Sequence, residues 1–420
     1  MYYERTVKET IKNISETFPV LLVTGPRQVG KTTVLESMLE PDRKKVTLDN
    51  PTIRALAKSD PELFLQRYSP PVMIDEVQYA PELFPYIKMI VDERKKPGDF
   101  WLTGSQMFKM MKSVTETLAG RAGIVPMLGL TSSEVNGNRF SPFELDIDML
   151  IERIKTARKM NVSEIFERIF KGSMPRLYEL DNINRELYFE SYLDTYLSRD
   201  IKELEQVGNE TAFIGFIKAV AARTATNVNY ETLAQETGVS APTAKQWLSI
   251  LVSCGMVALI QPYYNNALSR VIKTPRMYFL DTGLCAHLMG WGSAAVLESS
   301  SMSGEFFETW VVSEIYKSYL NAGRRPPLYF YRDSNKKEID LIIYQNGCVY
   351  PIEIKKGSAP HGATKNFSVL KPIEEEPDED EHFKGTAHLK TRIGTGAVIC
   401  LASDLIPVDK KNWFVPAWLI

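Results

Sequence analysis

The chain has 420 residues, a formal net charge of −2 and a sequence pI of about 6.2. Hydrophobic residues make up 44% and charged residues 24%, the composition of an ordinary soluble globular protein. The near-zero charge excludes a basic field over the whole molecule, so any contact with nucleic acid must come from local patches. The length predicts about three domains, each able to bury its own core.

The N-terminal stretch "MYYERTVKETIKNI" is polar and amphipathic, unlike a signal peptide. No apolar run reaches about 18 residues, so we expect no transmembrane helix. Four cysteines lie far apart and fit no zinc-binding spacing: Cys254, Cys285, Cys348 and Cys400. We therefore expect buried thiols in a reducing compartment, and a cytoplasmic protein without a membrane partner.

A nucleotide-binding loop is the first motif in the chain. The apolar run "PVLLVTG" (19–25) predicts a buried parallel strand, and "GPRQVGKTT" follows it before a helix-like segment. Small residues let backbone N–H groups cradle phosphates there, while Lys31 reaches the β- and γ-phosphates and Thr32 ligates Mg²⁺. The predicted nucleotide-binding residues are Gly25, Pro26, Arg27, Gln28, Val29, Gly30, Lys31, Thr32 and Thr33.

A pair of acids follows the next apolar strand, in "PPVMIDEVQYAPEL" (70–83). Asp75 is placed to hold the Mg²⁺ shell, and Glu76 is placed to act as general base on the attacking water. The alternative is a solvated pair in a loop. The nearby phosphate loop favours the catalytic interpretation.

A further strand, "DFWLTGSQ" (99–106), ends in Thr103, Ser105 and Gln106. Polar side chains at this edge either sense the γ-phosphate and orient the water, or cap the chain structurally. For Ser105 the two interpretations stay open.

Arg121 precedes another apolar strand within "ETLAGRAGIVPMLGLTSSE" (116–134). It either stabilises transition-state charge, in its own subunit or a neighbour's, or is a surface arginine. With "KVTLDNP" (45–51) there are five candidate strands separated by helical stretches. This alternation predicts an open parallel α/β sheet with its ligand at the carboxyl ends of the strands, that is, an ATPase.

Residues 146–205 show helical periodicity, interrupted by Gly172 and Pro175, and predict a helical subdomain beside the ATPase. Its end, "YLSRDI", carries Arg199 and Asp200. These two residues either contact the nucleotide domain or form a surface ion pair.

The segment 227–264 predicts a helix-turn-helix followed by two strands, the outline of a winged helix. Gly238 makes the turn, and the buried positions are Leu233, Ala234, Val239, Trp247, Leu248 and Leu251. The exposed positions of the second helix are Thr243, Lys245 and Gln246, with Arg270, Lys273 and Arg276 near the wing. DNA binding and a protein-contact or structural role both stay open.

The last third carries spaced carboxylates. An amphipathic helix at 303–320 bears Glu308, and 328–356 predicts two or three adjacent strands. Strand alternation places Glu353 and Lys355 on one face, with Asp340 on the neighbouring strand. Two carboxylates sharing Mg²⁺ beside a lysine can activate water at a phosphodiester, as in a PD-(D/E)xK nuclease. Alternating charges on a half-exposed strand are the alternative.

Seven of the eight residues 374–381 are carboxylates, within "IEEEPDEDEHF" (373–383). This segment is either a solvated loop or a mimic of DNA that shields a basic groove. The apolar segments 396–404 and 414–420 predict closing strands.

The fold class is therefore α/β: a P-loop NTPase parallel sheet, a helical subdomain, a winged helix and an α/β restriction-endonuclease-like domain. We expect these units at residues 1–145, 146–210, 211–285 and 286–420 respectively.

The motifs, in this order, resemble a large family of prokaryotic AAA-type ATPases with a C-terminal region of uncharacterised function. The matching stretches are "VTGPRQVGKTT", "LDNP", "VMIDEVQYAPEL", "LTGSQ", "LAGR", "YLSRDI", "FLDTGL", "GEFFETWVVSEI", "YFYRDSNKKEIDLII" and "IEIKKG". The resemblance implies ATP and Mg²⁺ at Gly25–Thr33 and Asp75/Glu76, a winged helix and a nuclease-like C-terminal domain. The long acidic insert after Lys356 departs from the family pattern. If it packed over the Asp340/Glu353 pair, it would repel phosphate and indicate a site that has lost its activity.

Two functions follow, together with a weaker third. The first is ATP hydrolysis that repositions the winged helix and gates a nuclease core acting on DNA. The second is a nucleotide-operated switch that binds protein partners, with an inert C-terminal scaffold. The third, a small-molecule kinase, leaves the C-terminal regions without a role. The chain is also a candidate homo-oligomer.

Overall fold

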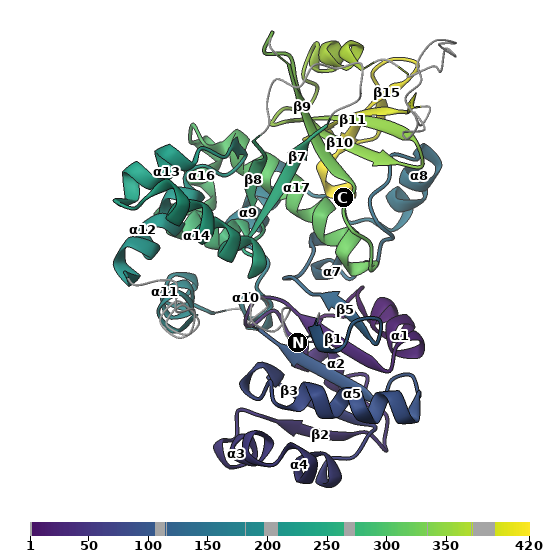
Figure 1. Ribbon diagram of the computed structural model, residues 1–420. Helices are drawn as coiled ribbons and strands as arrows, with labels where there is room; N and C mark the ends of the chain where they lie inside the picture. Colours follow the sequence, from purple (N-terminus) through teal and green to yellow (C-terminus); the bar gives the residue numbers. More distant parts are fainter. Residues whose placement is uncertain are drawn as a thin grey trace, which may run out of the picture.

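The computed structural model describes residues 2–105, 114, 116–180, 182–196, 209–263, 274–333, 335–370, 372 and 391–420. Within these residues the strands form two sheets. Figure 1 shows the N-terminal sheet at one end of the molecule and the C-terminal strands at the other.

The N-terminal sheet is entirely parallel. Its strands are β1 (Val20–Thr24), β2 (Lys44–Thr47), β3 (Val72–Asp75), β4 (Phe100–Gly104) and β5 (Ala122–Pro126). They lie in the order β2-β3-β4-β1-β5. Successive residues of β1 enter two separate cores: Leu21 and Val23 join one, Val20 and Leu22 the other. Both faces are thus buried, which confirms the open parallel α/β sheet expected from the apolar runs.

Helices flank this sheet: α1 (Lys8–Thr17), α2 (Lys31–Glu36), α3 (Pro51–Ser59), α4 (Pro61–Arg67), the 3₁₀ turn η1 (Val77–Tyr79) and α5 (Leu83–Arg94). Asn50 and Asp60 accept hydrogen bonds from the first backbone amides of α3 and α4. Each of these caps is followed by proline, which suits the first helical position.

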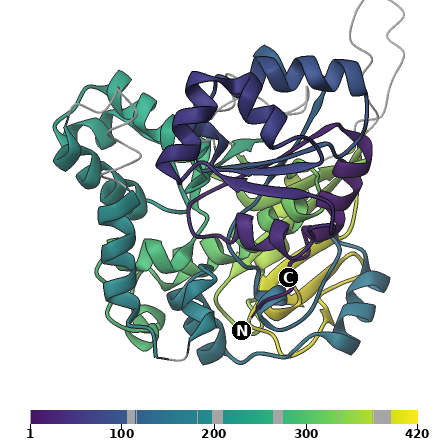
Figure 2. The ribbon, with the colours of Figure 1, turned by 90° about the horizontal axis from the view of Figure 1, so that it is seen from below.

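A helical stretch follows: α7 (Ser132–Val135), α8 (Ile147–Thr156), α9 (Val162–Lys171), α10 (Arg176–Glu179) and α11 (Arg185–Tyr196). In Figure 2, the teal helices that continue the chain lie to one side of the purple N-terminal domain.

The next unit alternates helices and short strands: α12 (Glu210–Ala221), β6 (Thr226–Asn227), α13 (Tyr230–Thr237), α14 (Ala241–Ser253), β7 (Val257–Pro262), β8 (Arg276–Phe279), α15 (Thr282–Leu288) and α16 (Ala294–Ser299). Gly238 ends α13 in the left-handed conformation, with φ of 68°. Trp247 of α14 is buried with its ring edge-on to Phe213 and Phe216 of α12. Packing of this indole fixes α14 against α12.

The C-terminal unit contains α17 (Ser303–Asn321), β9 (Leu328–Arg332), β10 (Glu338–Gln345), β11 (Cys348–Lys355), η3 (Ala363–Val369), β12 (Arg392–Ile393), β13 (Gly396–Cys400), β14 (Ile406–Pro407), β15 (Asn412–Pro416) and η4 (Ala417–Leu419). Strands β9, β10 and β11 are antiparallel neighbours, whereas β13 and β15 continue the sheet in parallel.

One sheet crosses the expected boundary between 211–285 and 286–420. Strand β7 pairs in parallel with β9, so the hairpin of β7 and β8 joins the edge of the C-terminal sheet. Helix α17 packs against β8, β11 and β5, and Figure 1 shows it between the two ends of the molecule. The positions of the domain boundaries remain predictions. No helix among the described residues is long and apolar enough to cross a membrane.

Candidate nucleotide site and a second carboxylate centre

The loop between β1 and α2 has the backbone that a phosphate cradle requires. Gly25 has φ of 146°, and an added Cβ would lie 1.9 Å from the backbone oxygen of Met127. Gly30 and Gln28 also have positive φ, 91° and 61°. The loop therefore turns sharply against the end of β5, and only glycine fits at position 25.

Lys31 and Thr32 open α2 with their side chains already engaged. The Lys31 ammonium is buried and donates to the backbone oxygens of Gly25 and Pro26 over 3.0 and 2.8 Å. The Thr32 hydroxyl donates to Asp75 Oδ1 over 2.8 Å. The end of β3 thus meets the start of α2, as expected for the two halves of a magnesium–phosphate site.

The side chains of Asp75 and Glu76, at the end of β3, have different hydrogen-bond partners. Asp75 is buried, and its Oδ1 also accepts a hydrogen bond from the hydroxyl of Thr103 on β4. The Glu76 backbone amide donates to the same Thr103 hydroxyl over 3.2 Å. The Glu76 carboxylate accepts from Ser105 over 3.2 Å and from Gln78. Thr103 and Ser105 are thus bound to the two acids.

The residues present fit a Mg²⁺ ion. A threonine hydroxyl and a carboxylate already lie within hydrogen-bond distance of each other, and Mg²⁺ prefers such oxygen ligands. Beside them lies an open pocket of about 570 Å³, a volume within the range of small-molecule sites. Its lining residues are Arg27, Gln28, Gly30, Lys31, Thr32, Thr33, Glu76 and Thr195.

Helix α11 supplies contacts to this pocket that the sequence did not indicate. Thr195 lines it, and the Tyr188 hydroxyl donates to Gln28 Oε1 over 2.8 Å. No motif marks these two residues, because their approach to the loop depends on how the helical stretch folds back.

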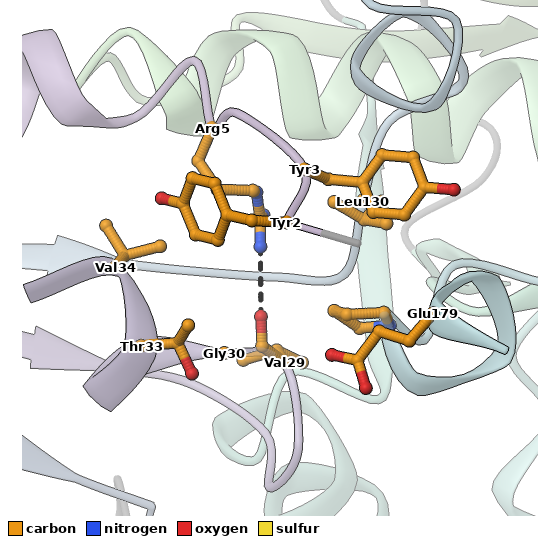
Figure 3. A pocket seen from close by; sticks show the side chains of 10 residues that line it. Tyr2, Tyr3, Arg5, Val29, Gly30, Thr33, Val34, Leu130 and Glu179 are labelled. Carbon is orange, nitrogen blue, oxygen red and sulfur yellow. Dashed lines mark hydrogen bonds between the residues drawn. The ribbon is translucent and has the colours of Figure 1, made fainter. Parts of the chain in front are cut away.

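A second cavity, of about 260 Å³, lies beside the same loop (Figure 3). Gly30 and Thr33 line both cavities. The residues around it come from the N-terminus, the phosphate loop, α2, the segment after β5, and α10 with the proline before it: Tyr2, Tyr3, Arg5, Val29, Gly30, Thr33, Val34, Leu130, Pro175 and Glu179. The Arg5 guanidinium donates to Val29 O over 2.9 Å, the dashed contact of Figure 3.

Of the alternatives for Arg121, the structure excludes only contact with the phosphate loop of its own chain. Arg121 lies immediately before β5, whose first residue is in register with Val20 at the start of β1. It pairs with Asp92 at 2.5 Å and is partly exposed. Because the strands are parallel, this is the amino end of the sheet, opposite the phosphate loop. Contact of Arg121 with a nucleotide therefore requires a second subunit.

Asp340, Glu353 and Lys355 come together in the C-terminal sheet. The pairing of Leu341 with Ile352 brings the preceding Asp340 opposite Glu353. Lys355 Nζ lies 2.8 Å from Asp340 Oδ2 and 2.7 Å from Glu353 Oε2. The lysine thus bridges both carboxylates from the same strand face as Glu353.

Glu308 on α17 approaches the same centre from the β8 side. Its Oε1 accepts from the Tyr278 hydroxyl over 2.7 Å and lies 3.2 Å from Arg276 Nη1. Arg276 also pairs with Glu338 and is buried. This corrects the expectation of a wing charge: Arg276 holds two strands to α17 and is not available to a phosphate.

Burial and crowding shift the protonation of these carboxylates. Burial, then the neighbouring Asp340, raises the pKa of Glu353 to about 8 and that of Glu308 to about 7. Burial alone would raise the pKa of Asp340, but the Lys355 charge and hydrogen bonds, one from the Ile354 amide, lower it below its usual value. Asp340 therefore carries the negative charge of the pair at neutral pH.

The C-terminal carboxylate centre offers few protein ligands for a metal ion. Among the described residues no group of three or more His, Cys, Asp or Glu is placed to hold a metal. Glu353 Oε1 is nevertheless buried without a hydrogen-bond partner among them. A divalent ion held by Asp340 and Glu353, with water as its other ligands, would satisfy this oxygen.

Other expectations concern exposed or undescribed positions. On α14, Lys245 and Gln246 are exposed and Thr243 is half-buried. Outside the described residues lie Gln106, Arg199, Asp200, Arg270, Lys273 and the acidic segment 373–383.

Comparison with known families matches residues 17–136 to a model described as an AAA domain. The matched range contains the five parallel strands, the phosphate loop and both acids at the end of β3. This unit is an AAA-type P-loop ATPase domain. Two further parts of the chain match domains of unknown function, DUF8612 at residues 162–295 and DUF4143 at 303–420.

The chain containing this AAA domain is similar to two uncharacterized proteins, from Mycobacterium bovis and Mycobacterium tuberculosis. Each is 29% identical over 346 residues, which cover 81% of this chain and 71% of the relative. Among solved structures, a Walker-type ATPase of Pyrococcus abyssi aligns with a TM-score of 0.41, 16% identity, and coverage of 67% of this chain and 94% of that one. RuvB of Thermotoga maritima aligns with a TM-score of 0.30, 16% identity, and coverage of 60% and 88%.

Proposed function

We propose that the AAA domain binds ATP with Mg²⁺ and hydrolyses it, and that hydrolysis is coupled to a C-terminal region acting on DNA. The observation that carries the proposal is the meeting of Thr32, Asp75 and Glu76 beside a pocket of about 570 Å³. A bound Mg²⁺ would neutralise phosphate charge, held by Thr32 and Asp75. Lys31 binds the phosphates, and Glu76 takes the proton of the attacking water.

The cavity in Figure 3 suits the purine base. It adjoins the phosphate pocket through Gly30 and Thr33, and two tyrosines and aliphatic side chains line it. Stacking and apolar contacts with such side chains favour a flat aromatic ring. Bound ATP would then connect the N-terminal residues Tyr2 and Tyr3 with the loop and with α10.

Coupling to the C-terminal region has a buried route through Arg5. Its guanidinium donates to Val29 O in the phosphate loop, and its Nε lies 3.2 Å from Glu134 Oε2. The same side chain donates to Leu128 O over 2.8 Å. A shift of the loop therefore moves the segment after β5.

That segment is bound directly to α17. The Glu314 carboxylate accepts from the Ser132 amide over 2.7 Å, and Lys317 donates to Leu130 O over 3.0 Å. Because α17 also carries Glu308, one helix contacts both the segment beside the ATPase and the C-terminal carboxylate centre.

The region from α12 to β8 also lies close to the loop, since Gly255 and Pro26 line the same small cavity. An added Cβ at Gly255, between α14 and β7, would lie 3.2 Å from Pro26 Cδ. We interpret α12-β6-α13-α14-β7-β8 as a winged helix, because its helix-turn-helix is followed by an antiparallel pair of strands. Because Pro26 and Gly255 lie close together, nucleotide binding would change the position of α14, which presents Lys245.

For the C-terminal unit we propose a PD-(D/E)xK-like core, supported by α17, the three antiparallel strands and the adjoining parallel β13. Asp340 and Glu353 would hold Mg²⁺, which would supply activated water, while Lys355 would hold the scissile phosphate.

A nicking assay on supercoiled DNA, with ATP and Mg²⁺, tests the nuclease part. Asp340→Asn should abolish nicking, whereas Asp404→Asn, on an exposed loop, should not. If wild-type protein nicks no DNA at any Mg²⁺ concentration, the nuclease part is wrong.

A specific observation favours a second function, a nucleotide-operated switch that binds a protein partner with an inert C-terminal scaffold. Lys355 already pairs with both carboxylates, and Arg276 is buried by Glu308 and Glu338. Binding to double-stranded DNA with sub-micromolar affinity and a steep salt dependence would count against this function.

The state of the cysteines bears on the location of the protein in the cell. All four cysteines are free thiols, as in proteins of reducing compartments, so we propose a cytoplasmic location. A homo-oligomer would give Arg121 a nucleotide to contact in a neighbouring subunit.

A further inference from the structure

We infer that Gln78 is a positioning residue for hydrolysis, which anchors one oxygen of Glu76 and leaves the other to accept the proton. This inference rests on the proposed ATPase activity, with Glu76 as general base. The carboxamide of Gln78 and the hydroxyl of Ser105 both donate to Glu76 Oε2. No described residue donates to Glu76 Oε1, and Glu76 itself lines the phosphate pocket.

The backbone makes this contact possible. Glu76 has φ of 56°, in the left-handed region, and η1 begins at the next residue. A residue other than glycine costs of order 1–3 kcal/mol in this conformation, and such strain clusters at functional sites. The turn brings the side chain at position 78 back to that at position 76. In an extended strand the two side chains would also lie on one face, but the chain would not turn back to bring them together.

The orientation of the Gln78 amide follows from its partners. A carboxylate only accepts hydrogen bonds, so the nitrogen end of the amide must face Glu76. The nitrogen also lies 3.4 Å from Ser105 Oγ, which closes a triangle of three side chains. The anchored Oε2 fixes the carboxylate plane, and a fixed plane aims Oε1.

The remaining oxygen of Gln78 argues against a purely structural role. Gln78 Oε1 is buried and accepts no hydrogen bond from the described residues. An unsatisfied buried polar atom costs stability, so an apolar side chain of similar size would fold as well or better. Retention of the amide at that cost fits a function in the active site.

The test compares Gln78→Leu with Gln66→Leu, the same substitution on the exposed surface of α4. Gln78→Leu should lower kcat roughly 10- to 100-fold, the effect of a misplaced catalytic group, with unchanged KM and Kd for ATP. Gln66→Leu should change neither. Thermal unfolding should show that Gln78→Leu is folded and no less stable than the wild type.

A double-mutant cycle separates positioning from structure. In a Glu76→Gln background, Gln78→Leu should cause little further loss of turnover, because the group it orients has gone. If Gln78→Leu lowers turnover by the same factor in the wild type and in Glu76→Gln, the inference is overturned. A normal kcat in Gln78→Leu would also overturn it. If wild-type protein does not hydrolyse ATP with Mg²⁺, the proposed function itself has failed. If the wild type hydrolyses ATP and Gln78→Leu hydrolyses it at the same rate, only the inference about Gln78 has failed.

Discussion

Glu76 and Glu353 are both carboxylates close to a strand end, but their surroundings suit different chemistry. Glu76 is half-buried at an open pocket, and its hydrogen-bond donors are a neutral amide and a neutral hydroxyl. Glu353 is buried beside Asp340, with Lys355 bridging the two. These surroundings fit the general-base role proposed for Glu76. Glu353 instead holds a proton at neutral pH unless a cation replaces it.

Glu76→Gln should retain ATP but slow its hydrolysis by roughly 10²–10⁴, the usual effect of losing a general base. Steady-state turnover together with equilibrium binding of ATP measures the two effects separately. Lys31→Ala is the comparison, because it should weaken binding itself. Normal turnover by Glu76→Gln would show that another group takes the proton.

Glu353 should make the stability of the protein depend on pH in metal-free buffer containing EDTA. Its folded pKa, about 8, lies above its ordinary value of 4.5, so the folded state keeps a proton that the unfolded chain releases. Stability should then fall as pH rises from 4.5 towards 8, by up to about 1.4 kcal/mol per pH unit. Glu353→Gln should lose less stability over this range.

Urea unfolding at pH 5, 6.5 and 8 measures this difference. Mg²⁺ at pH 8 should stabilise the wild type more than Glu353→Gln, because a cation favours the ionised carboxylate. Parallel pH curves for the two proteins would contradict the assigned protonation.

The loop after β1 shows how one element depends on its neighbour. Gly25 lies so close to Met127 at the end of β5 that no side chain fits there. The phosphate cradle is therefore shaped by the contact of β1 with β5 as well as by its own glycines. Asp75, at the end of β3, completes the site from beyond β4.

Gly25→Ala should destabilise the protein by about 2–6 kcal/mol, from overpacking and backbone strain together, and should weaken ATP binding. Gly120→Ala is the matched control: φ there is 73°, but nothing lies within 4 Å of an added Cβ. The control should cost only about 1 kcal/mol. Equal losses in denaturant unfolding would show that the clash with Met127 is relieved by movement.

The elements that follow local rules were predictable. Five apolar runs between helical stretches predicted the parallel sheet, and the strand-end rule brought Asp75 towards the phosphate loop. In the same way, strand alternation placed Glu353 and Lys355 on one face, where Lys355 pairs with both Glu353 and Asp340.

Contacts between distant segments were not predictable. Arg276 was expected near the wing, but its partners Glu308 and Glu338 lie 32 and 62 residues away in sequence. For Arg121 the sequence left a role at the nucleotide and a surface position both open, because an arginine near a strand can lie at either end of the sheet. Gln78 gave no signal, since its contact depends on the left-handed backbone of Glu76.

Helix α17 connects the two ends of the molecule. It touches the segment after β5 through Glu314 and Lys317, and it carries Glu308 beside the C-terminal carboxylates. Glu314 and Lys317 form a buried ion pair at 2.5 Å. A change of the phosphate loop that reaches Leu130 must therefore be accommodated by this pair.

Glu314→Gln should destabilise the protein by about 3–5 kcal/mol, because it leaves the Lys317 charge buried without its partner. The double variant Glu314→Gln/Lys317→Met should recover most of that loss. Denaturant unfolding of the wild type, Glu314→Gln and the double variant gives the comparison. A Glu314→Gln protein as stable as the wild type would show that water reaches Lys317.

Whether the ATPase and the C-terminal region act together on DNA is best tested by ATP hydrolysis. Turnover should be measured without DNA, with double-stranded DNA and with single-stranded DNA, using Glu76→Gln as the blank. We predict that DNA raises turnover by the wild type and leaves Glu76→Gln inactive. Turnover that is the same with and without either DNA would contradict the coupling and favour the protein-binding switch.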